Sequence, residues 1–134
     1  MSLPAVGEHA SRTKTITDAD IRTFATLSGD TNPVHLDEAA AAETVFGKRV
    51  AHGMLTASLI SAVLGCDLPG SGAIYLGQEL RFVAPVFIDD TVTATVEVVQ
   101  AREDKGIVTL RTIVTNQNAQ VVVEGKATVM VPSN

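Results

Sequence analysis

The chain has 134 residues, a one-domain length, and its 46% hydrophobic and 19% charged residues exclude an intrinsically disordered protein. The formal net charge of -5 argues against nucleic-acid binding, because phosphate backbones are bound by clustered positive charge. A single cysteine, Cys66, rules out an intrachain disulfide, and no apolar stretch is long enough to cross a bilayer. We therefore expect a cytoplasmic protein without membrane association.

The first predicted elements are a short strand over residues 12–17 and a helix that follows it. Thr17 is a suitable N-cap, because its hydroxyl can accept a hydrogen bond from a free N–H group of the first turn. This helix ends at Ser28-Gly29, and Asp37 can cap a second short helix over residues 38–44. An apolar stripe at helical spacing marks the first helix: Ile21, Phe24, Ala25 and Leu27.

The segment between these two helices and the helix that comes next differ sharply in character. Residues 29–37 should be irregular, because Pro33 lacks a donor and biases Asn32 away from the helical region. A third helix begins at His52-Gly53 and runs to about Leu64. It has almost no polar side, which is typical of a helix that is buried on most sides.

The C-terminal half alternates apolar and polar residues with a period of two, as strands rich in Val and Thr do. The apolar members of the four runs are Ile74, Leu76, Leu80 and Phe82; Val92, Ala94, Val96 and Val98; Val108, Leu110 and Val114; and Val121, Val123, Ala127, Val129 and Val131. Turns at residues 103–106 and 116–119 predict an antiparallel meander for the last three runs. Helices followed by such a sheet indicate an α+β domain, in which the sheet wraps round the central apolar helix.

Asp30 and His35 are the candidate catalytic pair. On a continuous helix their spacing would put the two side chains about 140° apart around the axis. The break at Asn32-Pro33 instead allows both side chains to face one point, where a carboxylate and an imidazole could act on one water as general acid and base. The competing interpretation is structural, with a turn-forming Asp and a His beside a helix, and the local pattern alone favours it.

The start of the apolar helix offers a second feature. Its free N–H groups and its dipole can stabilise an oxyanion, and Gly53 has no side chain to block an acyl group, although it could equally serve close packing alone. His52 is interpreted as a structural neighbour. Ser61 faces roughly the same side as Gly53 and could touch a ligand or bond to its own backbone. A metal site through His35 and Asp37 is disfavoured, and no nucleotide-binding loop is present, so we expect no metal and no cofactor.

Three segments taken together carry a family resemblance. They are Ser28–Asp37 (SGDTNPVHLD), Val50–Leu55 (VAHGML) and Tyr75–Phe82 (YLGQELRF). The chain resembles the MaoC-like (R)-specific enoyl-CoA hydratases, or hydratase 2 family, of polyhydroxyalkanoate-producing bacteria, and the likeness spans residues 10–132. The resemblance implies a hot-dog fold for residues 1–134 as a single MaoC-like domain, and a homodimer.

The same resemblance implies a lyase of fatty acid metabolism and polyhydroxyalkanoate biosynthesis. Such an enzyme adds water reversibly to a trans-2-enoyl-CoA and forms (3R)-hydroxyacyl-CoA without a cofactor. By motif position, Asp30 and His35 become the catalytic pair, the Gly53 N–H becomes the oxyanion donor, and Ser61 becomes a pocket residue.

Two bulky residues determine the length of the substrate's acyl chain that we expect. Leu64 on the helix and Val129 on the sheet should make the acyl pocket shallow, so that enoyl groups of roughly four to six carbons are preferred. The alternative functions are a (3R)-hydroxyacyl-[acyl-carrier-protein] dehydratase, a hot-dog acyl-CoA thioesterase and a non-catalytic acyl-CoA binding module.

Overall fold

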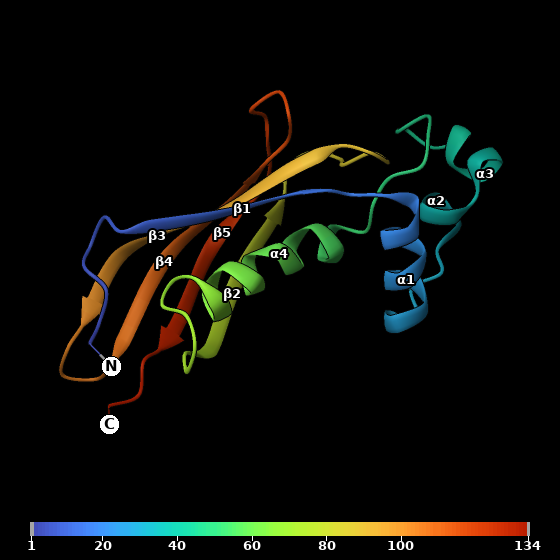
Figure 1. The fold of residues 1–134 in the computed structure, drawn as a ribbon. Coiled ribbons are helices and arrows are strands. Elements are labelled where there is room, and N and C mark those ends of the chain that lie inside the picture. Colours follow the sequence, from blue (N-terminus) through green and yellow to red (C-terminus); the bar gives the residue numbers. More distant parts are fainter. Residues whose placement is uncertain (1, 134) are drawn as a thin grey trace.

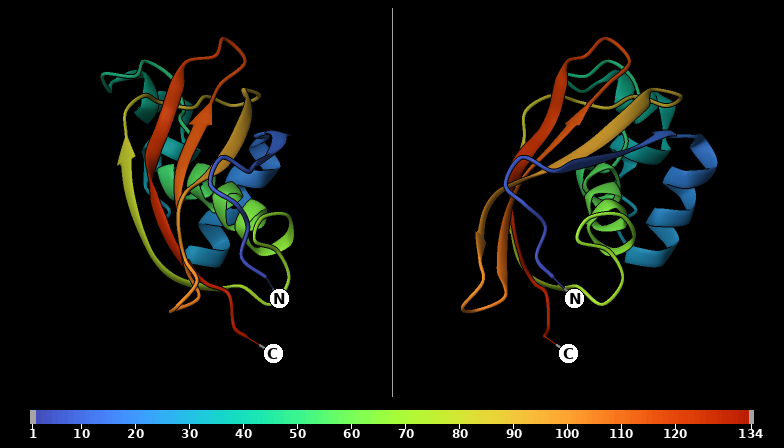
Figure 2. Two further views of the ribbon diagram at one scale, coloured as in Figure 1. Left: turned by 90° about the vertical axis from the view of Figure 1, so that its left-hand side faces the viewer. Right: turned by 60° about the vertical axis from the view of Figure 1, so that its left-hand side comes forward.

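The computed structural model describes residues 2–133 of the chain. In order, its elements are β1 (His9–Thr15), α1 (Asp18–Ser28), α2 (Pro33–Leu36), α3 (Glu38–Ala42), α4 (Gly53–Cys66), β2 (Ile74–Phe82), β3 (Thr91–Arg102), β4 (Ile107–Thr115) and β5 (Val121–Met130). The strands form one antiparallel sheet in the order β1-β3-β4-β5-β2, which curves against α4 (Figures 1 and 2). This confirms the expected α+β arrangement of a sheet wrapped on a central apolar helix.

The centre of the sheet is the predicted meander. β3 pairs with β4 and β4 pairs with β5, in each case antiparallel and through the expected turns. Alternate residues of these strands point inward and are buried, among them Val92, Ala94, Val96, Val108, Leu110, Val123 and Val129. They form one apolar core with Ile60, Val63 and Leu64 of α4, so the helix is held by the concave face of the sheet.

Helix α1 begins and ends as its sequence predicts, but its apolar stripe is only partly buried. Thr17 and Asp20 form a reciprocal capping box, and Gly29 closes the helix in the left-handed conformation at φ 82°. Ile21 and Ala25 are buried, whereas Leu27 is 82% exposed. Leu27 lies about 240° around the helix from Ile21, so it faces away from the core.

The segment expected to be irregular contains one helical turn, α2. Pro33 occupies the first position of this turn, where its missing N–H has no helical partner to lose. The Asn32 side chain caps the turn by accepting a hydrogen bond from Val34 N at 3.2 Å. The expectation of irregular backbone was therefore wrong for Pro33–Leu36, because the proline begins the helix instead of breaking it.

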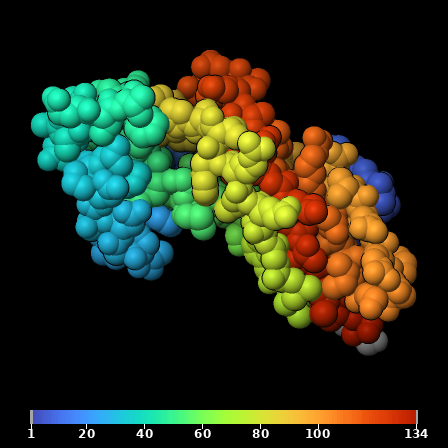
Figure 3. Space-filling model, turned by 180° about the vertical axis from the view of Figure 1, so that it is seen from behind, coloured from blue at the N-terminus to red at the C-terminus, as the bar shows by residue number. Residues whose placement is uncertain are grey.

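Helix α4 runs through Gly65 to Cys66 and is buried on one side only. Met54, Ser58, Ser61 and Gly65 are exposed along the other side. The expected burial on most sides is therefore not found within a single chain, and Figure 3 shows α4 in green between the α1–α3 block and β2. None of the helices within residues 2–133 is long and apolar enough to cross a bilayer.

The two edges of the sheet have opposite characters. Along the β1 edge, hydroxyl pairs join β1 to β3, and Arg12 and Lys14 form ion pairs with Asp67 and Asp20. The β2 edge instead exposes large apolar side chains: Ile74, Tyr75, Leu76 and Phe82. Helices α1 to α3 gather at one end of the molecule, beside the start of α4, and both chain termini lie toward the other end (Figure 1).

Candidate active site

The structure brings Asp30 and His35 together at the end of the molecule that carries α1 to α3. Asp30 lies just after the Gly29 cap of α1, and its Oδ1 accepts a hydrogen bond from Asn32 N at 3.2 Å. Its Oδ2 lies 4.0 Å from Nε2 of His35. The Asp30 side chain is 51% exposed and that of His35 only 12%, so the pair has one face open to an incoming molecule.

The His35 ring is held in one orientation by a backbone carbonyl. Its Nδ1 lies 2.8 Å from Val50 O, and a carbonyl can only accept, so Nδ1 carries the proton of the neutral ring. Nε2 is then the nitrogen with a free lone pair, and it is the atom that faces Asp30. The turn of α2 is fixed to the same place by a backbone bond from Val50 N to Val34 O at 3.2 Å.

His52 lies directly behind the pair. Its Nε2 is 2.9 Å from the backbone carbonyl of Asp30, and its ring stacks on that of His35 with the centroids 3.9 Å apart. Phe24 of α1 also packs against the His52 ring, with 4.8 Å between the centroids and 57° between the planes. The expectation that His52 is a neighbour of the site agrees with this placement.

Arg49 is a buried, charged residue that is hydrogen-bonded to the backbone of the site, and the sequence analysis did not identify it. Its Nε donates to His35 O at 2.7 Å, and its terminal nitrogens reach Asp18 at 2.5 Å and Glu38 at 3.4 Å. Burial disfavours the charged guanidinium, but the hydrogen bonds to Asp18 and Glu38 outweigh it and raise the pKa of Arg49. Hydrogen bonds from Arg49 and then Arg22 lower the pKa of Asp18. The partners of Arg49 lie far from it in sequence, so no local pattern indicates this hydrogen-bond network.

Gly53 is the first residue of α4, and it allows close packing whether or not its N–H also binds a substrate oxyanion. A Cβ built at this position would lie 2.7 Å from the Phe82 ring, so any larger residue would force that ring to move. The preceding residue, His52, is the N-cap of α4 and makes no side-chain capping bond. The first N–H groups of the helix are therefore free of a capping side chain and can meet a ligand.

A long hollow follows the exposed side of α4 toward β2. Its larger part, ≈470 Å³, is lined mainly by apolar residues that include Phe24, Met54, Tyr75, Leu76 and Leu80. A smaller part of ≈170 Å³ is lined by Ser61, Leu64, Gly65, Ala73, Tyr75 and Val129. The two parts share Ser61 and Tyr75 as lining residues, and the three predicted pocket residues, Ser61, Leu64 and Val129, all line the smaller part. Burial raises the pKa of the Tyr75 hydroxyl, which bonds to Gln78.

The predicted catalytic pair lies beside the start of α4, whereas Ser61 lies in the middle of the helix and Leu64 near its end. With a rise of about 1.5 Å per residue, Ser61 lies about 12 Å and Leu64 about 16 Å along the axis from Gly53. A four-carbon acyl group is much shorter than that. One chain therefore does not bring its own Asp30 and its own Leu64 to the same short substrate.

The side chains of Asp30, His35 and His52 are also of the types that bind metal ions. Their nearest ligand atoms lie within 4.8 Å of one another. However, the two imidazoles are stacked face to face with 28° between their planes, and imidazoles bound to one ion would instead point their lone pairs at a common centre. Asp37 points elsewhere, because its carboxylate caps α3 through Ala39 N and Ala40 N. The arrangement favours acid–base chemistry over a metal site.

Comparison with known proteins identifies the class to which this fold and site belong. Residues 4–120 match the family model described as MaoC like domain, so the chain belongs to that family. The resemblance inferred from the three sequence segments is confirmed.

Individual relatives define the branch of the family. The (R)-specific enoyl-CoA hydratase of Rhodospirillum rubrum is 58% identical over 127 residues, which are 95% of this chain and 88% of the relative. The Aeromonas caviae protein of the same name is 51% identical and covers 95% of both chains. A solved structure, an (R)-hydratase from A. caviae involved in PHA biosynthesis, superposes with a TM-score of 0.93 over 96% of this chain and 98% of that one, at 50% identity. The hot-dog fold is thereby confirmed. A mitochondrial 3-hydroxyacyl-[acyl-carrier-protein] dehydratase of Arabidopsis thaliana is 35% identical, over 98% of this chain and 80% of the relative.

Proposed function

We propose that this protein is an (R)-specific enoyl-CoA hydratase, a lyase that adds water to a trans-2-enoyl-CoA and yields the (3R)-hydroxyacyl-CoA. The observation that carries the proposal is the convergence of Asp30 Oδ2 and His35 Nε2, 4.0 Å apart, beside the start of α4. It is supported by the 58% identity to a protein named for this activity.

The spacing of the pair suits one shared water. Two atoms 4.0 Å apart can both lie about 2.8 Å from the same water oxygen, which then donates one hydrogen to Asp30 and one to His35. The lone pairs of that oxygen are left to attack C3 of the enoyl group. One member of the pair takes a proton from the water as the C3–O bond forms, and a proton is returned to C2. The π electrons of the C2–C3 double bond move onto the thioester oxygen during the attack and return to form the C2–H bond.

We assign to Gly53 the stabilisation of the charge that develops on the thioester oxygen. The free N–H at the start of α4, together with the helix dipole, would stabilise it. Removing one such donor typically costs about 10²–10³-fold in kcat. No step of this chemistry requires a metal or a redox cofactor.

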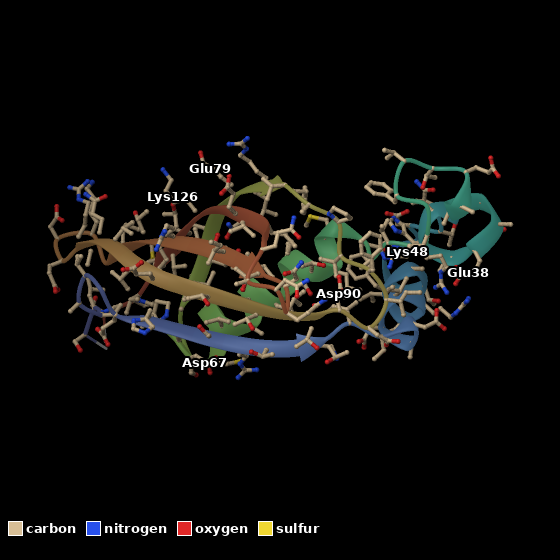
Figure 4. All side chains as sticks on the ribbon, turned by 90° about the horizontal axis from the view of Figure 1, so that it is seen from above. Glu38, Lys48, Asp67, Glu79, Asp90 and Lys126 are labelled. Atoms are coloured by element: carbon tan, nitrogen blue, oxygen red, sulfur yellow. The ribbon has the colours of Figure 1, made fainter. Side chains whose placement is uncertain are left out.

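Charge distribution favours coenzyme A over acyl-carrier protein as the carrier. Among residues 2–133, only Lys48 and Lys105 of the ten basic residues have no carboxylate within 4.0 Å. A surface so neutralised offers little to an acidic carrier protein, which needs a wide basic patch. Lys48 lies at the end that carries α1 to α3 (Figure 4). Its ammonium is 4.3 Å from the centre of the Phe87 ring, and we assign it to the phosphates of coenzyme A.

The separation of the catalytic pair from the acyl pocket supports a homodimer. The apolar β2 edge and the exposed side of α4 form one continuous uncovered surface. A second chain related by a two-fold axis would bring its α4 alongside in the opposite direction, and Leu64 of the partner subunit would then approach Gly53 of the first. Sedimentation at micromolar concentration should give twice the chain mass; a fully active monomer would contradict the composite site.

An assay with crotonyl-CoA tests the function. The proposal predicts loss of the conjugated enoyl absorbance with no release of free thiol, and formation of the (3R) product. Release of thiol would show a thioesterase instead, and thermal stabilisation by the substrate without turnover would show a binding module. Comparison of the crotonyl group on coenzyme A and on acyl-carrier protein decides the carrier, since the alternative dehydratase function requires the protein-bound substrate to react faster.

A further inference from the structure

His52 makes contacts to three separate parts of the site at once. The residue is only 2% exposed. Through Nε2 it holds the backbone carbonyl of Asp30 at 2.9 Å, through its face it supports the ring of His35 at 3.9 Å, and through the chain it is joined directly to Gly53. The catalytic carboxylate, the catalytic imidazole and the oxyanion donor therefore share one neighbour.

We propose that His52 is a positioning residue for the hydration reaction. By these contacts it fixes the distances from Asp30 and His35 to the Gly53 N–H. The inference rests on the proposed hydratase function and goes beyond it, because that function assigns no role to His52. A water held by Asp30 and His35 attacks C3 while the Gly53 N–H binds the thioester oxygen, which is two bonds from C2. The distances from the catalytic pair to the Gly53 N–H must therefore match the substrate. A displacement of about 1 Å can cost about 10²-fold in rate.

The hydrogen bonds exclude direct proton transfer by His52. The Asp30 carbonyl can only accept, so the proton of the neutral His52 ring is on Nε2 and is engaged there. Nδ1 is buried and has no hydrogen-bond partner among the described residues. Neither nitrogen is open to substrate, in contrast to His35, whose Nε2 faces the half-exposed Asp30 carboxylate. The two stacked imidazoles are therefore predicted to be opposite tautomers.

Two substitutions separate the two contacts of His52. Gln at this position keeps an N–H donor close to the place of Nε2 but loses the aromatic face. Phe keeps a ring to stack on His35 but has no donor for the Asp30 carbonyl. A positioning role through the hydrogen bond predicts that His52→Gln retains more activity than His52→Phe.

The experiment measures kcat and KM for crotonyl-CoA in the parent, in both His52 variants and in Val63→Ala. We expect kcat to fall about 100-fold in His52→Phe and about 10-fold in His52→Gln, with KM changed less than about threefold, because His52 touches the catalytic pair and not the bound tail. Val63 is a fully buried α4 residue, and its truncation should lower Tm while leaving kcat at the parental value. This control separates lost positioning from lost stability.

Several results would overturn the inference. They are parental kcat in folded His52→Phe, equal loss in the Gln and Phe variants, and a loss carried by KM alone. If His52→Phe does not fold, long-range ¹⁵N–¹H spectra of the parent at pH 8 decide: the proton should be on Nε2 in His52 and on Nδ1 in His35, and a proton on Nδ1 of His52 contradicts the bond to Asp30. Failure of the proposed function is distinguishable, because the parent would then not hydrate crotonyl-CoA at all.

Discussion

Leu64→Ala should lengthen the acyl group that the enzyme accepts. Leu64 is 2% exposed and lines the ≈170 Å³ end of the hollow with Ser61 and Val129. An eight-carbon substrate has four more methylene groups than crotonyl, and burying each contributes about 0.8 kcal/mol. If all four are accommodated, the gain is about 3 kcal/mol, so the eight-carbon to four-carbon ratio of kcat/KM should rise by at most about 200-fold.

The same substitution has a structural cost that must be separated from specificity. Leu64 belongs to the core between α4 and the sheet, and truncation of such a residue costs about 2–5 kcal/mol of stability. Leu59→Ala is the matched control, because Leu59 packs on the same core from the same helix and lines neither part of the hollow. It should lower Tm and leave the chain-length ratio unchanged.

The assay is kcat/KM for four-carbon and eight-carbon trans-2-enoyl-CoA in the parent, Leu64→Ala and Leu59→Ala. A ratio that rises only in Leu64→Ala supports the pocket. An unchanged ratio in folded Leu64→Ala removes this residue from the pocket wall, and an equal rise in both variants shows that loosened packing, not a longer pocket, changed the specificity.

Further expectations concern the catalytic pair, the buried network and the carrier. Asp30→Asn and His35→Gln should each lower kcat by about 10²-fold or more while the proteins stay folded; near-normal turnover in either removes it from the pair. Asp18→Asn should reduce the free energy of unfolding at pH 7, measured with urea. Because Arg49 and Arg22 lower the pKa of Asp18, its stabilising effect is present above pH about 4 and is lost as the pH falls through the lowered value, so the variant and the parent should converge in acid. Lys48→Gln should raise KM for crotonyl-CoA but not for a crotonyl thioester that lacks phosphates, whereas Lys105→Gln, in the β3–β4 turn, should change neither.

Features that depend on neighbours in sequence were predictable. The Thr17 and Asp37 caps, the Gly29 stop and the alternation of β3 to β5 each involve residues within a few positions of one another, and all were found where expected. The turn at Pro33 shows the limit of local reasoning, since the same proline can end a helix or begin one.

Features that depend on distant residues were not predictable. Arg49 is buried because Asp18, Glu38 and the His35 carbonyl converge on it from three elements, and nothing near Arg49 in sequence indicates this. Likewise, the apolar composition of α4 predicts burial but does not say by what, and in one chain the sheet covers only one side of the helix. The motif supplied the candidate site residues, whereas the stacking of His52 on His35 and the placement of Arg49 beneath them required the structure.

The contrast between the two sheet edges also limits how far the chains can associate. The β2 edge exposes Ile74, Tyr75, Leu76 and Phe82 beside its ion-paired Glu79 and Arg81, whereas β1 exposes no large apolar side chain and carries Arg12 and Lys14 in ion pairs that a further strand would have to disturb. If two chains join through their β2 edges, as proposed, the combined sheet ends in two β1 edges of polar and charged residues, and it has no apolar edge on which to grow. The proposed association would therefore stop at two chains, and substitution of Arg12 and Lys14 by apolar residues is expected to produce assemblies larger than a dimer in sedimentation.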